Sequence, residues 1–599
     1  MRTLNDVHLQ FASFFEEEQL RPYAYLLSKR MQEGHICIHP NDVRRYKNEI
    51  PFEFTPDTRL LYKIPHLVST KPDHIAPFIL YNDRLYLQRY FVYETQILES
   101  IRKLLEGEGD LFQQRSNALM SLRSFIEQLQ ANAPNAGIPV NEKPDWQLAA
   151  AIQAVLHHFS IITGGPGTGK TTTVAKILAI LYTLQPDLRV ALAAPTGKAA
   201  VRMAESLKLT NLNLPQHITD KFQSLTPSTI HRLLKYIPGS VYFRYNADNP
   251  LPFDVIIVDE ASMIDVPLFA KLLQAVPQTS RIIFLGDKNQ LASVEAGSML
   301  GDLCRSIPQT NVLTDSSANY INSFITDCDR QIPPAFIGKQ DSFLAEHIIE
   351  LQRSHRFNSM GGIGLLSKAI IRNDQQALAS ILAGSPDPAV RIDHDFSESV
   401  FDDFVKGYEE YINEKDVQQA LVKMNKLRVL VAVREGERGL YTINKKIEAA
   451  LKKRGLLQTD EEFYENRPII VTKNNKDLQL FNGDVGIIRR DKDNTVRAWF
   501  EDSNKKIRSV MPAYIAHAET VFAMTIHKSQ GSEYDNVLVL LPENAENKLL
   551  TRELLYTAVT RAKSFVIIQS TKDILLNTAQ AEVQRASGIK ERFEQMTNR

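Results

Sequence analysis

One short segment of the sequence combines the residue types that bind phosphate. It follows an apolar run, Phe159 to Thr163, and precedes apolar residues at helical spacing from Val174 to Leu181. Glycines after a strand let the chain turn sharply, so that backbone N–H groups face a triphosphate at the start of the helix. The segment therefore predicts a nucleotide-binding loop made of Gly164, Gly165, Pro166, Gly167, Thr168, Gly169, Lys170 and Thr171.

Two side chains of this loop have separate expected roles. Lys170 would reach the β- and γ-phosphates, and the Thr171 hydroxyl would complete the coordination shell of a Mg²⁺ ion. The alternative is a glycine-rich turn that binds no ligand. It is disfavoured because the glycine–lysine–threonine spacing and both flanking patterns match the motif.

A pair of carboxylates, Asp259 and Glu260, stands at the end of another apolar run, Val255 to Val258. Phosphoryl transfer to water needs a carboxylate that holds Mg²⁺ and a group that orients the attacking water. We assign Asp259 to the metal and Glu260 to the water, as general base. An isolated pair of this kind is usually a helix cap or a solvated corner, but its position after an apolar strand and a phosphate loop favours the catalytic role.

Three further residues are candidates for contact with the γ-phosphate. Gln290 follows the apolar run Arg281 to Leu285, and it would sense the γ-phosphate or, alternatively, cap the next helix. Arg356 and Arg561 lie further along the chain. An arginine that reaches the γ-phosphate stabilises the developing charge and is worth on the order of 10³-fold or more in rate. For either arginine taken alone, a surface ion pair with a carboxylate is the simpler alternative.

The composition limits the class of protein. A chain of 599 residues is too long for a single core, so we expect about three or four domains. The chain has 43% hydrophobic and 23% charged residues, which is ordinary for a globular protein. Because 70 Lys and Arg balance 70 Asp and Glu, a nucleic-acid partner would have to bind a local groove.

The cysteines and the apolar runs bear on location. Cys37, Cys304 and Cys328 are far apart and lack the spacing of metal ligands, which disfavours a disulfide framework or a zinc site. The N-terminus has no apolar signal core, and no run approaches the ~18 residues that a membrane span needs. We therefore expect a cytoplasmic protein.

Apolar strands that alternate with helical stretches predict two parallel α/β units, of which only the first has the phosphate loop. The expected strands of the first unit are Phe159 to Thr163, Arg189 to Ala194, Val255 to Val258 and Arg281 to Leu285. Those of the second are Arg428 to Val433, Val521 to Thr525, Val537 to Leu541 and Ser564 to Ile568. A strand-rich stretch with turn signals, Arg467 to Tyr514, predicts a small β-barrel inserted in the second unit.

The region before the first unit ends in a Pro- and Gly-containing stretch, Ala133 to Pro144. In it, Phe78 to Leu87 reads as a tight hairpin, and Glu94 to Glu106 as a helix that ends at Gly107. The hairpin and helix carry a group of large apolar residues that form either the region's own core or a docking patch for a large partner: Leu85, Tyr86, Leu87, Tyr90, Phe91 and Tyr93. The fold of Ser306 to Gln340 is left open.

The motifs, taken in their order, resemble those of superfamily 1 DNA helicases over about Gln147 to Ser570. The resemblance rests on Gln147, the phosphate loop, Ala194 to Ala200, Thr229 to His231, Asp259 and Glu260, Gly286 to Gln290, Arg356, Thr525 to Gly531 and Arg561. Within that superfamily the chain resembles the RecD family, the alpha subunits of exodeoxyribonuclease V. That narrower resemblance rests on Leu291 to Gly297, Leu480 to Gly486, Gly34 to Ile38 and Asp83 to Leu87.

This resemblance implies an α/β fold with two RecA-like parallel-sheet P-loop domains, an SH3-like β-barrel inserted in the second, and an N-terminal mixed α+β docking domain. The implied bounds are 1–130 for the docking domain, 145–350 and 351–599 for the RecA-like domains, and about 467–514 for the barrel.

The resemblance also implies roles for residues that spacing alone does not assign. Gln147 would read the adenine, and Gly531 with Glu533 would lie near the ribose. The track for single-stranded DNA would be lined by Pro195, Thr196, His231, Thr525 and His527. For His231 and His527, an ordinary packing role is the alternative.

The implied activity is ATP-dependent and Mg²⁺-dependent movement along DNA in the 5′-to-3′ direction, with ATP bound between the two units. The implied partners are RecB-like and RecC-like subunits in a heterotrimer that processes double-strand DNA ends for recombinational repair. We assign no DNA cutting to this chain. The alternatives are a stand-alone helicase of the same superfamily, a P-loop kinase or transferase, and a structural subunit with a silent ATP site.

Overall fold

The computed structural model describes residues 6–130, 138–210, 212–357, 361–384, 387–475, 477–502, 506–543, 548–583 and 585–597. The chain forms two compact units. The first consists of Met1–Lys288, Ala292–Arg353 and Gln584–Arg599, and the second of Asn289–Leu291 and Ser354–Val583. The C-terminal segment, which the sequence assigned to the second unit, therefore belongs to the first, and part of the expected boundary at Ala133 to Pro144 lies outside the described residues.

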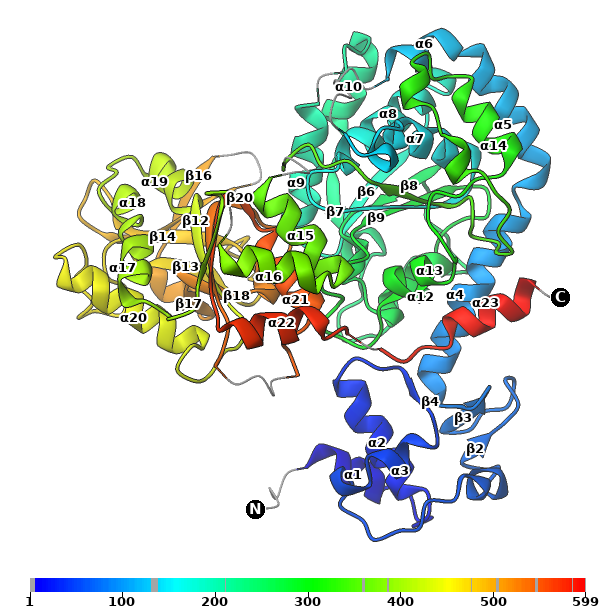
Figure 1. Cartoon of the computed structure of the whole chain (residues 1–599), viewed down its shortest axis with the longest axis horizontal. Coiled ribbons are helices and arrows are strands. Elements are labelled where there is room, and N and C mark those ends of the chain that lie inside the picture. The colour runs from blue at the N-terminus through cyan, green and yellow to red at the C-terminus, as the bar shows by residue number, and fades with distance from the viewer. Residues whose placement is uncertain are drawn as a thin grey trace. The chain divides into compact units, whose positions relative to one another are not determined.

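The first unit contains a parallel sheet of six strands in the order β10-β5-β9-β8-β6-β7 (Figure 1). Its strands are apolar because both faces of the sheet are covered. All four strands expected from the sequence are present, and the short edge strands β7 and β10 are additional. The strands are β5 (Phe159–Gly164), β6 (Val190–Ala194), β7 (Pro227–Thr229), β8 (Val255–Val258), β9 (Arg281–Gly286) and β10 (Ile348–Leu351).

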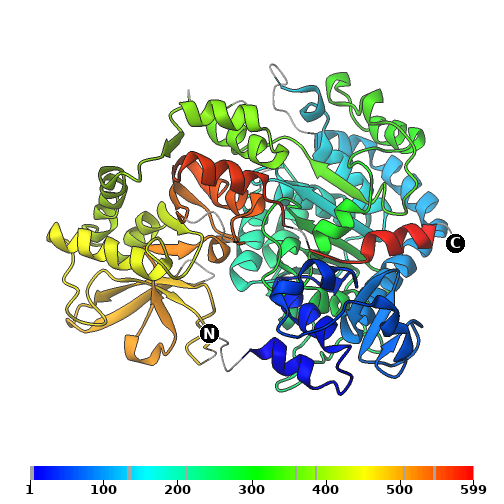
Figure 2. The same ribbon diagram turned by 60° about the horizontal axis from the view of Figure 1, so that its bottom comes forward.

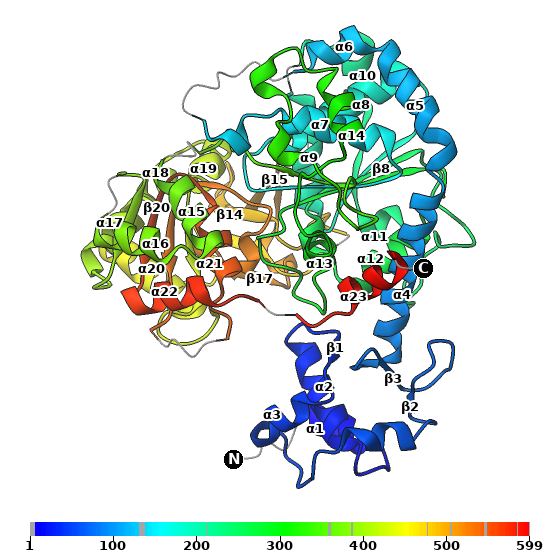
Figure 3. The ribbon, with the colours of Figure 1, turned by 45° about the vertical axis from the view of Figure 1, so that its right-hand side comes forward.

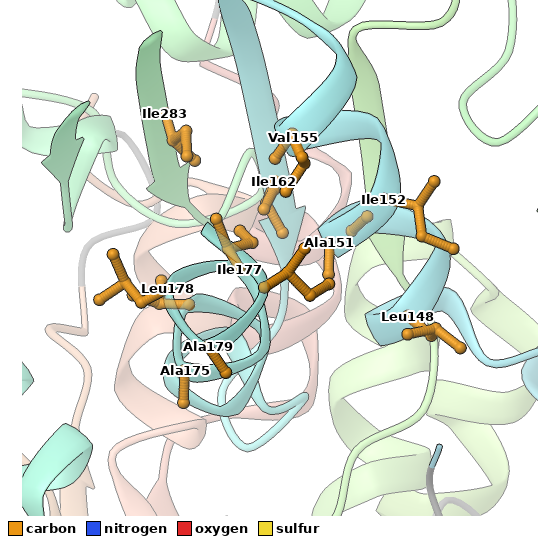
Figure 4. Close-up of a cluster of buried hydrophobic side chains, with 14 of the residues drawn as sticks. Leu148, Ala151, Ile152, Val155, Ile162, Ala175, Ile177, Leu178, Ala179 and Ile283 are labelled. Atoms are coloured by element: carbon orange, nitrogen blue, oxygen red, sulfur yellow. The ribbon is translucent and has the colours of Figure 1, made fainter. Parts of the chain in front are cut away.

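Helices α7 (Trp146–Leu156) and α8 (Lys170–Leu184) cover one face of this sheet. Ile162 of β5 and Ile283 of β9 pack with Ile152 and Ile177 from these helices in one buried cluster (Figure 4). Neighbouring residues on the same strands face a second cluster on the other side. Burial on both faces fixes the strand ends, and with them the loops that follow the strands.

The other helices of this unit are mostly short. They are α1 (Val7–Ser13), α2 (Arg21–Gln32), α3 (Asp42–Arg45), α4 (Gln88–Glu106), α5 (Gly109–Ser121), α6 (Arg123–Gln128), α9 (Gly197–Lys208), α10 (Gln216–Ser224), α11 (Ile230–Leu233), α12 (Val266–Gln274), α13 (Met299–Arg305), α14 (Asp315–Asn322) and α23 (Ile589–Thr597). The stretch that the sequence left open, Ser306 to Gln340, contains α14 and two short 3-10 helices, Cys328–Arg330 and Pro334–Phe336, and Phe336 packs against Trp146.

The N-terminal region has a small sheet of its own, in the order β1-β4-β3-β2. The predicted hairpin is confirmed: β3 and β4 pair antiparallel, and Asn82 and Asp83 between them have φ values of 48° and 53°. Positive φ at both central residues is the conformation of a tight hairpin turn. The strands are β1 (Cys37–Ile38), β2 (Val68–Ser69), β3 (Phe78–Tyr81) and β4 (Arg84–Leu87).

The large apolar residues of this region are core residues. Leu85, Tyr86, Tyr90 and Phe91 are buried, and Leu87 and Tyr93 are partly covered and pack against the hydrophobic core. For the four buried residues the docking alternative is therefore wrong, while docking of a partner by other residues of this region stays a prediction.

The predicted helix of this region is part of α4, which packs against α12 beside the six-stranded sheet. Ile97, Ile101 and Leu104 of α4 share a buried cluster with Phe284 of β9. The N-terminal region and the six-stranded sheet are thus joined by a common core, and they form one unit.

The second unit contains a parallel sheet of five strands in the order β11-β20-β19-β12-β18. The four strands expected from the sequence are confirmed, and β11 (Val390–Asp393) is additional. The others are β12 (Leu427–Val431), β18 (Ala523–Thr525), β19 (Tyr534–Leu540) and β20 (Ala562–Gln569). The helices are α15 (Gly362–Arg372), α16 (Gln375–Ala383), α17 (Glu398–Lys406), α18 (Glu409–Ile412), α19 (Val417–Met424), α20 (Leu440–Lys453), α21 (Arg552–Val559) and α22 (Lys572–Gln580).

An antiparallel sheet in the order β16-β15-β14-β13-β17 is inserted between β12 and β18 (Figure 2). It encloses a small core that includes Ile488, Ala498 and Phe500. The strand-rich insertion is thereby confirmed, while its closure into an SH3-like barrel stays a prediction. The strands are β13 (Pro468–Val471), β14 (Val485–Arg490), β15 (Val496–Glu501), β16 (Ile507–Val510) and β17 (Ala518–Thr520). In the described part of the chain, no helix has the length and apolar character needed to cross a membrane.

Candidate nucleotide and DNA sites

The phosphate loop joins the carboxyl end of β5 to the start of α8, as its sequence predicts. Gly169 precedes the helix with a φ of +87°, in the left-handed region that glycine adopts without strain. Lys170 Nζ donates to the carbonyl oxygens of Gly164 at 2.7 Å and Gly165 at 3.2 Å. The lysine therefore folds back over the loop, with its charge at the helix N-terminus, where phosphate binds in loops of this type.

Gln147, at the start of α7, lies directly against this loop. Its Nε2 donates to the carbonyl oxygen of Thr168 at 3.1 Å. A methyl group on Gly169 would come within 2.1 Å of the same Nε2, so a larger side chain there would displace the Gln147 amide. The structure thus brings the expected adenine-reading residue next to the expected phosphate-binding residues.

Asp259 and Glu260 follow β8 at the same edge of the sheet as the phosphate loop, because β5 and β8 run parallel and both end there. Glu260 has a φ of +52°, which is uncommon for a residue other than glycine and is typical of functional sites. Its backbone N–H donates to Asp259 Oδ1 at 2.8 Å. Burial and the neighbouring Glu260 carboxylate raise the pKa of the Asp259 carboxyl to about 6, and the charge of Lys170 opposes this rise.

These residues fit a magnesium ion. A hydroxyl from Thr171 and a carboxylate from Asp259 are the hard oxygen ligands that Mg²⁺ prefers. Burial and, after it, repulsion by the adjacent Glu260 raise the pKa of Asp259, and a bound cation would offset both effects. The donor chemistry therefore matches a metal–nucleotide complex.

Three residues expected to contact DNA follow strands β6 and β7 at the same edge of the sheet. Pro195 and Thr196 follow β6, and the Thr196 hydroxyl caps α9 by accepting from the N–H of Ala199 at 3.3 Å. His231 is exposed on α11, with its ring 5.7 Å from the ring of Phe243. Burial of part of the ring lowers the pKa of His231. Their contact with DNA stays a prediction.

The predicted residues of the second unit gather at the start of β19 and β20. Arg356 forms an ion pair with Glu533, through Nη2 and Oε1. Lys563 Nζ lies 4.0 Å from the other oxygen of Glu533. A residue expected at the ribose and a residue expected at the γ-phosphate are thus direct partners in this structure.

Arg561 is 3% exposed, so it is not the surface arginine that the alternative required. Its Nε donates to the carbonyl oxygen of Thr557 at 3.1 Å, and its Nη1 to that of Ser532 at 3.1 Å. The hydroxyl of the same Thr557 accepts from the N–H of Leu291 at 3.0 Å. Thr557 therefore links Arg561 to the segment that carries Gln290, a role that sequence reasoning did not assign although Thr557 lies within the motif.

Gln290 is buried and lies in irregular chain, well before α13. Ser298 holds the N-cap position of α13, so Gln290 does not cap that helix. Gln290 belongs to the second unit, where Gln530 Nε2 donates to the carbonyl oxygen of the adjacent Leu291 at 2.7 Å.

The remaining predicted residues of this unit lie between β18 and β19. Thr525 ends β18 and is 8% exposed, and its hydroxyl accepts from the N–H of Lys528 at 3.3 Å. His527 lies in the short helical turn that follows, and Gly531 has a φ of +70° in the turn before Glu533. A ribose or DNA contact for these residues stays a prediction.

Away from the phosphate loop, one group in the described part of the chain has the donor types of a metal site: Glu108, His157 and His347. Hydrogen bonds account for its arrangement. Glu108 Oε2 accepts from His157 Nδ1 at 2.8 Å, and His347 Nδ1 donates to the carbonyl oxygen of Phe159 at 3.0 Å. Burial, with a contribution from His157, lowers the pKa of His347 to about 4, so the ring is neutral at pH 7. The group fixes the start of β5, at the opposite end of the strand from the phosphate loop.

Two family models match this sequence. One, described as an AAA domain, matches residues 147–296, and the other, described as a UvrD-like helicase C-terminal domain, matches residues 520–568. The first match contains Gln147, the phosphate loop, Asp259 and Gln290, and the second contains Glu533 and Arg561. Two parallel α/β units that carry these motifs define a superfamily 1 helicase.

Sequence identity to curated relatives identifies the family within this superfamily. The chain is 32% identical over 570 residues to the RecBCD enzyme subunit RecD of Haemophilus influenzae, with 89% of this chain and 84% of the relative covered. It is also 32% identical over 585 residues to RecBCD enzyme subunit RecD of Mycobacterium tuberculosis strain H37Rv, with 94% and 90% covered. The chain belongs to the RecD family. It is 28% identical to the ATP-dependent RecD2 DNA helicase of Deinococcus radiodurans, of which it covers 54%.

Proposed function

We propose that this chain is the ATP-driven 5′-to-3′ DNA helicase subunit of a helicase–nuclease complex that processes double-strand DNA ends for recombinational repair. The observation that carries the proposal is the placement of the phosphate loop and the Asp259–Glu260 pair at one edge of a single parallel sheet, in a member of the RecD family. A structural subunit with a silent site is disfavoured, because every residue type that the ATPase chemistry requires is present.

The first unit binds the nucleotide. ATP with Mg²⁺ supplies the reactive phosphate and the charge-neutralising cation. The loop from Gly164 to Thr171 binds the phosphates, with Lys170 against the β- and γ-phosphates. Asp259 and Thr171 hold the metal, Glu260 orients and deprotonates the attacking water, and Gln147 binds the adenine.

The second unit supplies groups that act on the γ-phosphate. Arg356 and Arg561 stabilise the charge that develops during hydrolysis, and Gln290 senses whether the γ-phosphate is present. Glu533 holds Arg356 by an ion pair, and together with Gly531 it contacts the ribose. The pairing of Arg356 with Glu533 and the bonds of Arg561 to backbone carbonyls support this assignment, because they hold both guanidinium groups in fixed positions.

Movement follows from the cycle of ATP binding and hydrolysis. Single-stranded DNA contacts Pro195, Thr196 and His231 on the first unit and Thr525 and His527 on the second. Hydrolysis removes the γ-phosphate that both units bind, so the two DNA-contacting surfaces alternately approach and separate. Each cycle moves the chain along one strand.

The proposed partners are RecB-like and RecC-like subunits in a heterotrimer, as the name of the relatives indicates for those proteins. Because the substrate is chromosomal DNA, we propose that the complex acts in the cytoplasm. A stand-alone helicase shares all the motifs, but the relatives covered over most of their length are subunits of the RecBCD enzyme. A P-loop kinase or transferase would have no use for a second α/β unit with buried arginines.

Unwinding of duplexes with single-stranded tails tests the proposal. Duplexes with a 5′ tail or a 3′ tail are offered to the full chain alone and to the chain assembled with its partner subunits. We expect ATP-dependent unwinding of the 5′-tailed duplex by the assembled complex. ATP-dependent unwinding only from 3′ tails in a complex whose second motor has been inactivated would contradict the proposed direction, and failure to assemble would contradict the proposed partners.

A further inference from the structure

One arginine near the C-terminus holds the loop that follows the predicted γ-phosphate sensor. Within the first unit, Arg585 Nη1 donates to the carbonyl oxygens of Gly297 at 2.6 Å and Glu295 at 3.2 Å. Its Nη2 donates to that of Ser293 at 2.7 Å. The Ser293 hydroxyl donates to the same Glu295 and Gly297 carbonyls, at 2.9 and 3.2 Å. A single planar guanidinium thus fixes the backbone of the loop Ser293–Gly297.

An N-terminal segment completes this arrangement. The N–H of Gly297 donates to the carbonyl oxygen of Gly34 at 2.9 Å, and that of Ile36 to Ala586 at 3.1 Å. A methyl group on Gly34 would lie 2.7 Å from Arg585 Nε, so only glycine lets the guanidinium approach this closely. We refer to Gly34–Ile36, Ser293–Gly297 and Arg585–Ala586 as the three-segment junction.

The junction lies where the chain passes between its two units. Residues Asn289–Leu291, which include Gln290, belong to the second unit, while Lys288 and Ala292 on either side belong to the first. The N–H of Lys288 donates to Thr163 Oγ1 at 3.1 Å in the first unit. Arg585 follows the last passage of the chain, after Val583. The chain crosses between the units at four places, and the crossings after Leu291 and after Val583 each lead into the junction.

This geometry has a mechanical consequence for Gln290. Residues 289–291 belong to the second unit, and the chain on either side of them belongs to the first. If the two ends of this segment are held in place, any movement of one unit against the other displaces the segment. If the loop after Leu291 were loose, it would absorb the displacement and the position of Gln290 would no longer follow the motion. A fixed loop transmits the motion, and Arg585 donates three of the hydrogen bonds that fix it.

We propose that Arg585 is a positioning residue that fixes the loop Ser293–Gly297 and thereby couples the sensing of the γ-phosphate by Gln290 to movement along DNA. The inference rests on the proposed function and assigns a new residue to it. It concerns coupling, so it predicts a change in the number of nucleotides travelled for each ATP rather than a loss of nucleotide binding.

Other contacts hold the C-terminal segment in place without Arg585. The N–H of Gly588 donates to Glu94 Oε1 at 2.8 Å, and Arg592 Nη1 forms an ion pair with Glu94 Oε2 at 3.0 Å. Helix α23 lies beside α4 in Figures 1 and 3. Substitution of Arg585 therefore removes the guanidinium from the loop while the segment keeps its other contacts.

The test compares Arg585→Ala and Arg585→Lys with a matched control, Arg552→Ala, in the full chain assembled with its partner subunits. Arg552 also donates to backbone carbonyls, those of Ala579 and Gln580, but it lies in the second unit. Translocation rate on single-stranded DNA and ATP turnover are measured on the same samples, with the partner motor inactivated. Hydrogen exchange reports the Gly297 amide.

For Arg585→Ala we expect an unchanged KM for ATP, a roughly tenfold or larger fall in nucleotides moved per ATP, and loss of exchange protection at Gly297. Arg585→Lys should restore part of the coupling, and Arg552→Ala should match the unsubstituted chain. Normal coupling in Arg585→Ala, with or without loss of protection at Gly297, would overturn the inference. If the unsubstituted chain itself shows no DNA-stimulated ATPase, it is the proposed function that fails.

Discussion

Arg356 and Glu533 form an ion pair in the second unit, and their side chains are only 18% and 14% exposed. Such a pair is costly to break from one side, because the remaining charge keeps little water around it. The pair holds the Arg356 guanidinium in place, which supports the proposed contact of Arg356 with the γ-phosphate.

We expect Glu533→Gln to lower the DNA-stimulated kcat by about tenfold, because Arg356 loses the partner that positions it. Steady-state ATPase assays at saturating DNA measure this change. Glu398→Gln, which removes the carboxylate of the exposed pair between Glu398 and Lys446 in the same unit, is the control and should leave kcat unchanged. An unaltered kcat in Glu533→Gln would show that Arg356 needs no such support.

Arg561→Ala should separate binding from hydrolysis. If Arg561 acts on the transition state, ATP still binds, while turnover falls on the order of 10³-fold. The structure adds a second effect, because the substitution leaves the buried carbonyls of Thr557 and Ser532 without this donor, at a cost of about 1–3 kcal/mol in unfolding free energy. Nucleotide-binding titration, turnover and thermal unfolding are measured together. Weakened binding with unchanged turnover would mark Arg561 as a ground-state contact.

Asp259→Asn should make the nucleotide-free chain more stable and inactive. The pKa of Asp259 in the folded chain, about 6, lies above its ordinary value of 3.8, so the folded state holds the proton more tightly than the unfolded state does. The folded chain therefore loses stability as the pH rises from about 4 to about 6, with no further loss above that.

The Asn variant escapes this loss, so its advantage should grow through that window and reach about 1–3 kcal/mol at pH 7. Urea unfolding at several pH values, without nucleotide or Mg²⁺, measures the difference. An advantage that is equal at pH 4 and pH 7 would contradict the assigned charge state. Asp254→Asn is a suitable comparison, since the adjacent Arg189 lowers the pKa of Asp254 and reverses the expected sign.

DNA binding should depend on salt, because a chain without net charge must bind DNA in a local groove. The logarithm of the affinity for single strands should fall against the logarithm of salt concentration by about 0.7 for each phosphate neutralised. Fluorescence anisotropy over a salt series measures the slope. An affinity that does not change with salt would exclude the groove.

The parallel sheets and the phosphate loop were predictable from the sequence, because buried strands are long apolar runs and the loop has a fixed spacing. Strands β7, β10 and β11 were missed, since three or four residues at a sheet edge carry little periodicity. The aromatic residues of the N-terminal region were noticed in the sequence, but their role could not be decided from it. Their pattern fits both a core and a docking patch, and only the packing of Tyr86 and Phe91 distinguishes the two.

The site was partly predictable for the same reason. Motif residues such as Lys170 and Asp259 follow parallel strands that end at one edge of the sheet. The topology of the sheet therefore predicts that these residues lie close together. The pairing of Arg356 with Glu533 and the contact of Arg585 with Gly297 join residues that are distant in sequence. No local sequence pattern predicts such contacts. The composition of the C-terminal segment likewise does not indicate that it packs in the first unit.

Lys170→Gln in the assembled complex tests the central claim most directly. The variant lacks the cation that binds the phosphates, while its fold should be intact because Lys170 Nζ donates to carbonyls of its own loop. With the partner motor inactivated, we predict that the complex with Lys170 hydrolyses ATP in response to DNA and unwinds 5′-tailed duplexes, and that the Lys170→Gln complex does neither. Near-normal DNA-stimulated ATPase and unwinding in the variant would contradict the account.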